Sequence, residues 1–569
     1  MYSDPVRQEV FDQLRDRDCS VFAKYLTWGV FVEAARRAGL RLWSCPLNLA
    51  NLAWLGISAA WRKGDSFVTI LTVTLKLLQD QEHFGQSAFG QDLAKKQRSA
   101  AKSKKRKKKI SKSAAKKPKQ KKGKGKPTAE SPKQKEGKGK PTAKSPKQKK
   151  GKPAAENPKQ KKGKGKPTAE SPKQEKDNSK HRPHGKDPAQ VTEEAFAKAR
   201  QRMPIAFWFA LLTVLVERFE AEHAERLRFR GFRLLAMDGT RLTLPDEEAL
   251  RTFYGTASNG HGQHNAQARM VLLQSPLTRL PLAYQLQPVK IGEVTMARQL
   301  ASGLRPDDLL LLDSGYVSYG LLWDIQRRNA FFCIRLQRAM NLCTLRTDRQ
   351  TGDRWVRWTP KDSRGQWRRE GLPRSLELRL VEYQVPGYRR IVLATNVLAT
   401  ERLSHDDFCR LTTSGTNLLP GLYHMRWEVE TSFAEMKIKQ QMEGGFRSRK
   451  PAGIAYEVAG HVVLYLLVRW LIVEAAVKHG EDPLRISFID ALRELQQLWS
   501  TIAVSSPEWV AETLMPRLLQ RIASHLVPYR PGRSYPRKKK KKQAKAKTTK
   551  SKGKKQAKAK TTKSKQTKS

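Results

Sequence analysis

The sequence predicts an α/β protein with a helical N-terminal region, a β-rich insertion and long disordered lysine-rich segments. Three observations support this. Short apolar runs bounded by Gly, Pro and Asp alternate with helical segments across 191–400. Helical spacing of apolar residues dominates 1–92 and 401–530. Residues 93–190 have no aromatic side chain and almost no aliphatic one larger than alanine, so they cannot form a core.

The charge is concentrated in two appendages. The 569 residues carry a net charge of +58 and are sufficient for several domains with a large core. Residues 95–190 contain 37 Lys and Arg against 7 Asp and Glu, and 537–569 contain 17 basic residues and no acid. The remaining chain is therefore only mildly basic.

The cysteines and apolar runs indicate an intracellular protein. The five cysteines are far apart and form no CxxC pair, which argues against a disulfide framework or a zinc site. The charged N-terminus does not read as a signal peptide. The apolar runs Ile205–Val216 and His461–Val477 are respectively too short and too charged to cross a membrane, so we expect buried helices, no membrane partner and a cytoplasmic location.

In chain order, residues 1–92 are expected to be a helical region, with DNA binding and a plain helical bundle both open. Residues 93–190 repeat the unit PKQKKGKGKPTAES, and the tail, 531–569, repeats QAKAKTTKSK. Such polybasic disordered chains bind nucleic-acid phosphates without sequence preference. A solvated linker or a segment for acidic membranes is the alternative.

Residues 191–336 are expected to hold the first part of a catalytic core. After a helical stretch interrupted near Pro204, the strand Phe232–Met237 is predicted to end at Asp238, where Gly239 allows a turn into a second short strand. The apolar strand Asp308–Leu312 ends at Asp313 in the same way. Aspartates at strand ends are common in turns, but strand ends are also where catalytic carboxylates collect.

Residues 337–400 are predicted to be a β-rich insertion, followed by the second part of the core and C-terminal helices in 401–530. A helix is expected at Leu403–Ser414. The insertion mixes arginines with three tryptophans, which suits either nucleic-acid contact or an ordinary sheet with solvated arginines. These tryptophans are Trp355, Trp358 and Trp367.

The segment from Tyr423 to Lys437 is predicted to be a helix with an acid between two bases. At about 100° per residue, Tyr423, Arg426, Glu430 and Lys437 share a stripe roughly 60° wide. An apolar stripe lies beside it, and the remaining face is expected to be solvated. The apolar residues are Leu422, Met425, Val429, Phe433 and Met436, and the solvated face includes Glu428 and Glu435.

Three carboxylates, Asp238, Asp313 and Glu430, can hold a pair of divalent cations if they converge. Oxygen ligands favour Mg²⁺ or Mn²⁺, and two such ions stabilise the attacking and leaving oxygens of phosphoryl transfer. Arg426 and Lys437 could bind backbone phosphates and Tyr423 could add a hydrogen bond. Two acids from strands and a third from a helix, in that order, form the layout of an RNase H-like core.

At these residues the sequence resembles the DDE transposases of bacterial insertion sequences, in the group with the signature Tyr-x2-Arg-x3-Glu-x6-Lys. Tyr423, Arg426, Glu430 and Lys437 meet every interval. The runs MDGT at 237–240 and LLLDSGY at 310–316 are similar to the two aspartate motifs, and Gly292-Glu293 and Arg426-Trp427 also fit. The basic repeats are not part of the family pattern.

The resemblance implies metal-dependent cleavage at transposon ends and strand transfer into target DNA, with the protein dimeric on DNA and nucleoid-associated in bacteria. Relatives use a hairpin intermediate in which an aromatic residue of the insertion stacks on a flipped base, for which the three insertion tryptophans are candidates. A non-catalytic DNA-compacting protein and another RNase H-like nuclease are the alternatives. His261 and His264 lie in a Gly/Asn/Gln-rich loop, where a flexible surface segment is the simpler interpretation than a metal site.

Overall fold

The computed structural model describes residues 22, 24–41, 49–61, 192–256, 265–336, 340–361, 365–384, 390–412, 418–504 and 509–528. The chain forms two compact units. Unit 1 contains residues 1–215, 244–253 and 444–461, and unit 2 contains 216–243, 254–443 and 462–569. The lysine-rich repeats, the basic tail, His261 and His264 lie outside the described residues.

Unit 1 is helical where it is described. The helix pair expected around Pro204 is present as α6 (Glu193–Arg202) and α7 (Ile205–His223), because proline cannot continue the first helix. Its core forms where α3 meets aromatic side chains: a Cβ on Gly56 would lie 2.8 Å from the ring of Trp208, and Tyr456 donates to Leu52 O at 2.5 Å. The other helical elements here are α2 (Trp28–Arg37), α3 (Leu49–Trp61) and α8 (Glu248–Tyr254).

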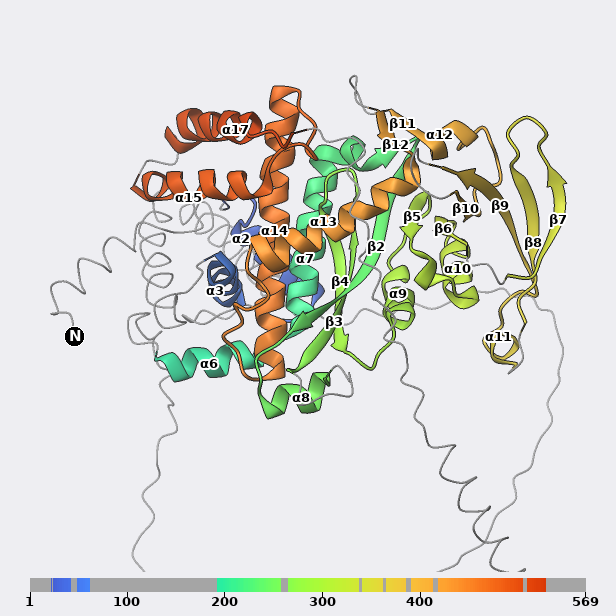
Figure 1. Ribbon diagram of the computed structural model, residues 1–569. Helices are drawn as coiled ribbons and strands as arrows, with labels where there is room; N and C mark the ends of the chain where they lie inside the picture. Colours follow the sequence, from blue (N-terminus) through green and yellow to red (C-terminus); the bar gives the residue numbers. More distant parts are fainter. Residues whose placement is uncertain are drawn as a thin grey trace, which may run out of the picture. The chain divides into compact units, whose positions relative to one another are not determined.

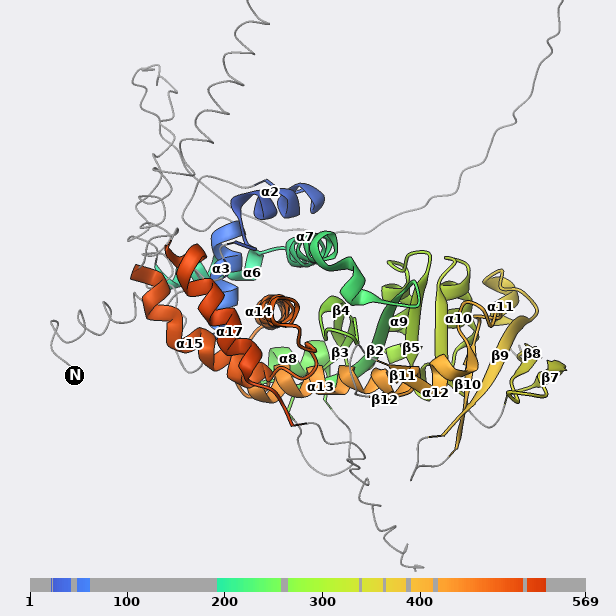
Figure 2. The same cartoon turned by 90° about the horizontal axis from the view of Figure 1, so that it is seen from above.

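Unit 2 is built on one 10-stranded sheet with the order β4-β3-β2-β5-β6-β10-β9-β8-β7, and β1 pairs with β2. In Figure 2, β2, β5, β10, β9, β8 and β7 can be followed in this succession. Among the described strands, the neighbours that pair in parallel are β2 with β5 and β5 with β6. The strands are β1 (Arg228–Phe229), β2 (Phe232–Thr243), β3 (Gln267–Gln274), β4 (Pro281–Pro288), β5 (Asp308–Leu312), β6 (Phe331–Arg335), β7 (Leu342–Thr347), β8 (Arg354–Trp358), β9 (Leu376–Tyr383) and β10 (Ile391–Thr395).

The β-rich segment predicted at 337–400 extends this sheet. β10 pairs antiparallel with β6, with Leu393 opposite Arg335, so β7 to β10 continue the same hydrogen-bonded ladder (Figure 1). Trp355 and Trp358 are 8% and 6% exposed. The Trp355 ring lies under Arg346 and the Trp358 ring meets Tyr319 edge-on. Both tryptophans therefore serve packing in this structure.

The helices of unit 2 cover the sheet. α9 (Glu293–Ala301) packs against β3 and β4, α10 (Tyr319–Gln326) against β6, and α13 (Glu428–Ala434) against β2. The predicted helix Leu403–Ser414 is wrong in its second half. The observed helix, α12 (His405–Cys409), is shorter, and the next residues form β11 (Arg410–Thr412). The partner of β11 is β12 (Leu418–Pro420). The remaining elements are α11 (Gln366–Arg369), α15 (Phe488–Val504), a π-helix at Val510–Leu514 and α17 (Met515–Ser524), with 3₁₀ turns at Ala224–Leu227 and Ser314–Tyr316.

The long apolar helix α14 (Pro451–His479) has the length and composition to cross a membrane. However, 94% of its most apolar window is buried inside the protein. Its side chains from Val462 to Val473 are essentially inaccessible to solvent. α14 is therefore a core helix, as its Arg469 and Glu474 predict.

Candidate active site

Asp238 and Asp313 come from neighbouring parallel strands. Met237 of β2 lies opposite Leu312 of β5 in the parallel pairing. Asp238 and Asp313 are the next residues of the two strands, so they lie at the same level of the sheet. β5 ends at this point, but β2 does not. The turn predicted at Gly239 is wrong, because β3 pairs with β2 continuously from Ala236 to Thr243. Asp238 thus lies within β2, at the point where the neighbouring strand β5 has ended.

The segment carrying Glu430 is helical but not a uniform α-helix. Leu422–Trp427 is 3₁₀, Glu428–Ala434 is α and Glu435–Lys439 is π. The 100° spacing therefore applies only to its middle, and a π turn inside a helix is frequent at functional sites. The apolar stripe is confirmed: Leu422, Met425, Val429, Phe433 and Met436 are all buried.

Arg426 joins the acids. Its Nη1 donates to Asp238 Oδ2 at 2.9 Å, and its Nη2 donates to Glu430 Oε1 at 3.0 Å. Arg426 is 5% exposed, so these charge-assisted bonds form in a largely desolvated place. Asp313 acts electrostatically on Asp238, Arg426 and Tyr423. The structure thus joins Asp238 and Glu430 through one guanidinium and places Asp313 at the end of the adjoining strand.

Desolvation dominates the ionisation of Asp238. Burial raises the pKa of its carboxyl, and the charges of Glu430 and Asp313 raise it further. The Gly239 N–H, at 2.8 Å from Oδ1, and the Arg426 guanidinium act in the opposite direction without cancelling the shift. A carboxyl whose ionisation is opposed by burial and by two neighbouring acids is typical of a functional site.

Lys437, in the π turn, contacts β2 beyond Asp238 and away from the Arg426 guanidinium. Its Nζ donates to Arg241 O at 2.8 Å and pairs with Glu443 Oε2 at 2.7 Å. Glu443 also accepts the Thr243 N–H at 2.8 Å. Burial raises the pKa of Glu443, but Lys437 and Thr243 outweigh it and hold the pKa below the usual range. Lys437 therefore ties the end of the helical segment to β2, a role that its spacing alone did not reveal.

Tyr423 is 5% exposed, and burial raises the pKa of its hydroxyl, so it is a neutral phenol. Tyr316, three residues after Asp313, is 2% exposed, and its pKa is raised by burial and by Asp238, Glu293 and Asp313. Its hydroxyl makes no hydrogen bond within the described residues. Sequence reasoning did not single out Tyr316, although it lies in the LLLDSGY run.

The glycine after Asp238 lies close to the Glu293 side chain. A Cβ at Gly239 would lie 2.8 Å from Cδ of Glu293, the first residue of α9. Glu293 also lies 3.6 Å from Arg269 of β3. This contact links the MDGT run to the Gly292-Glu293 pair, two features that the sequence shows only as separate motifs.

The face of the helical segment that was expected to be solvated is so only in part: Lys439 is exposed and Glu428 is half-buried, whereas Glu435 is buried in an ionic cluster. Glu435 accepts hydrogen bonds from Tyr465 Oη at 2.6 Å and Arg279 Nη1 at 3.1 Å, and pairs with Arg469. Glu428 accepts from Arg279 Nε at 2.6 Å. The solvated assignment of Glu435 is wrong because the π turn places it against α14, where it pairs with Arg469. Residue spacing along the sequence could not indicate this distant partner.

The donor set fits a hard divalent cation, because Asp238, Asp313 and Glu430 offer only carboxylate oxygens. The group of described residues whose ligand atoms all lie within 4.8 Å of one another is a different one. It consists of Glu222 and His223 at the end of α7 and Glu474 on α14.

Comparison with known proteins shows which proteins this part of the chain resembles. Residues 230–467, which contain all six residues of the predicted site, match the family model described as "Transposase DDE domain". The transposase InsG of insertion sequence element IS4 from Escherichia coli (strain K12) is 28% identical over 327 residues. The match covers 54% of this chain and 67% of InsG. Over residues 230–467 the chain is therefore similar to the DDE transposases.

Among solved structures, this chain is similar to a chain of the piggyBac transposase synaptic complex with hairpin DNA. That similarity has 13% identity and a TM-score of 0.27, and it covers 53% of this chain and 59% of the solved chain. A TM-score this low supports no conclusion about the fold.

Proposed function

We propose that this protein is a DDE transposase that uses Asp238, Asp313 and Glu430 to hold two Mg²⁺ or Mn²⁺ ions, cleaves DNA strands at insertion-sequence ends and joins the freed 3′ end to target DNA. The observation that carries the proposal is the pair of bonds from Arg426 to Asp238 and Glu430, with Asp313 on the adjoining strand. Acids on β2, after β5 and on α13 also support an RNase H-like core.

In this proposal each protein group has a defined task. The three carboxylates position the cations, which when bound supply charge to the attacking and leaving oxygens of the phosphodiester. Arg426 balances the carboxylates, and release of one of its two bonds would let the guanidinium contact a phosphate. Lys437 keeps the helical segment against β2, and the neutral Tyr423 phenol can donate to a phosphate oxygen.

The exposed aromatic beside this site is Trp427. Its side chain is 48% exposed, and its ring stacks on His424 with an interplanar angle of 16°. Because Trp355 and Trp358 are buried, Trp427 is better placed than either to stack on a DNA base. We propose that Trp427 contacts an unpaired base near the scissile phosphate.

The proposal extends to the assembly. Holding two DNA ends requires two active sites, so we propose a homodimer on DNA, at the bacterial nucleoid. The lysine-rich segments would add salt-dependent, sequence-independent affinity for DNA.

The test is cleavage of a duplex that carries the native element's end, with Mg²⁺, by the purified chain and three variants. Asp313→Asn and Glu430→Gln should abolish cleavage and leave DNA binding intact. Glu377→Gln is the matched control, because Glu377 is an exposed acid that pairs only with Arg357 on the neighbouring strand in the described contacts. Cleavage at the parent rate by Asp313→Asn would refute the proposed site, and binding without cleavage by the parent would favour the DNA-compacting alternative.

A further inference from the structure

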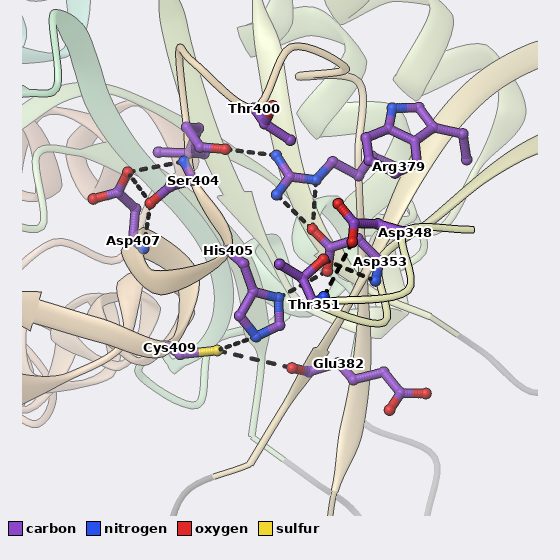
Figure 3. A network of polar contacts seen from close by, with 12 residues as sticks. Asp348, Thr351, Asp353, Arg379, Glu382, Thr400, Ser404, His405, Asp407 and Cys409 are labelled. Carbon is purple, nitrogen blue, oxygen red and sulfur yellow. Dashed lines mark hydrogen bonds and ion pairs between the residues drawn. The ribbon is translucent and has the colours of Figure 1, made fainter. Parts of the chain in front are cut away.

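Away from the carboxylates, unit 2 contains a cysteine, a histidine and an aspartate in hydrogen-bonding sequence. Figure 3 shows His405 between Asp353 and Cys409. His405 Nδ1 lies 2.8 Å from Asp353 Oδ1, and His405 Nε2 lies 3.4 Å from Cys409 Sγ. His405 and Cys409 stand one turn apart on α12 (His405–Cys409), and Asp353 lies immediately before β8.

The aspartate is fixed in place. Asp353 and Arg379 are both fully buried, and Arg379 Nε and Nη2 donate to Asp353 Oδ2 at 2.8 and 2.5 Å. A third guanidinium nitrogen donates to Leu403 O. Paired in this way, Asp353 is a carboxylate that only accepts hydrogen bonds, so the hydrogen between it and His405 belongs to Nδ1. His405 Nε2 is then the basic nitrogen, and it faces the thiol.

We propose that Cys409 is an activated thiol that forms mixed disulfides with low-molecular-weight disulfides, with His405 as its base and Asp353 as the group that orients the base. A nucleophile next to a base that is held by a third group is the arrangement that raises side-chain nucleophilicity. Glu382 O also accepts from Sγ, at 3.8 Å, and the Glu382 side chain is paired with Arg390.

The exchange is balanced without any further reactant. The Cys409 proton passes to His405 Nε2, and the thiolate attacks one sulfur of the disulfide R–S–S–R. The Cys409 S–S bond forms as the original S–S bond breaks. The released R–S⁻ takes the proton from the imidazolium. Cys409 is oxidised, and half of the disulfide is reduced to a thiol.

The chain supplies its own comparison cysteines. Cys343 is exposed, Cys409 is partly exposed and Cys333 is buried. In the described contacts, the Cys343 thiol donates to Thr344 O at 4.0 Å. If accessibility alone determined reactivity, Cys343 would react fastest. A base beside Cys409 reverses this order, and most clearly below the usual cysteine pKa of about 8.5, where an ordinary thiol is almost fully protonated.

The experiment is incubation of the full chain with oxidised glutathione, followed by peptide-resolved mass spectrometry of each cysteine from pH 5.5 to 9. We expect Cys409 to be modified about tenfold faster than Cys343 at pH 6, with the two rates converging at high pH. His405→Gln should remove this advantage while the pairing of Asp353 with Arg379 maintains the fold, which circular dichroism checks. Slower modification of Cys409 than of Cys343 throughout, or an unchanged Cys409 rate in His405→Gln, would overturn the proposal.

Discussion

Glu435 should be among the most sensitive stability positions of unit 2. Glu435→Ala removes the partner of Arg469, which is fully buried, whereas Arg279 keeps Glu428 as a partner. Breaking a buried pair and leaving one charge uncompensated costs about 3–5 kcal/mol. Glu435→Gln keeps the shape and one hydrogen-bond acceptor, so it should cost about 1.5–3 kcal/mol, the value of a hydrogen bond to a charged group.

The effect also has a defined pH dependence. Burial raises the pKa of Glu435, but Arg469 and Arg279 outweigh it, and the folded-state pKa is lowered. A lowered carboxyl pKa contributes stability above the unfolded value, about 4.3, and this stability is lost as the pH falls through the folded value. The penalty of Glu435→Gln should therefore be full at pH 7 and diminish in acid.

Urea unfolding followed by tryptophan fluorescence at pH 7 and at pH 3.5 measures these differences. Glu377→Gln, which loses one half-exposed surface ion pair, is the control and should change stability by less than about 1 kcal/mol. A loss of less than 1 kcal/mol in Glu435→Ala at pH 7 would show that the cluster does not hold the helical segment as its contacts indicate.

Three further outcomes are expected. Asp238→Asn should raise stability at pH 7 and lose that gain in acid, because a raised folded-state pKa opposes folding above it; urea titration checks the sign. Gly239→Ala should lower DNA cleavage without unfolding the chain, since the new methyl group displaces the Glu293 side chain beside the Asp238 strand; cleavage assays and circular dichroism separate the two. Trp427→Ala should weaken binding to DNA with an unpaired base by about 1–3 kcal/mol, whereas Trp355→Ala should destabilise the protein instead.

The sequence predicts local elements well where a short apolar run has clear ends. β5 has the predicted bounds, and α14 is buried as predicted. Errors arise where a distant partner decides. β2 continues through Gly239 because β3 pairs with it. The sequence also did not show that β10 joins the main sheet by pairing with β6.

The candidate site shows the same division. Spacing along one helix placed Arg426 and Glu430 together, and they form a hydrogen bond. Spacing did not show that Asp238 takes the other side of the same guanidinium, because that contact joins residues 188 positions apart. Nor did it show the burial of Glu435, which depends on a π turn and an arginine of α14.

The most direct test of the central claim replaces Mg²⁺ with Fe²⁺ and generates hydroxyl radicals at the bound ion with ascorbate and peroxide. Mass spectrometry then identifies which peptide segments are cut. Convergence of Asp238, Asp313 and Glu430 on cations predicts cuts near all three, and their loss in Asp313→Asn. Cuts confined to the surroundings of Glu222 and Glu474, or an unchanged pattern in Asp313→Asn, would contradict it.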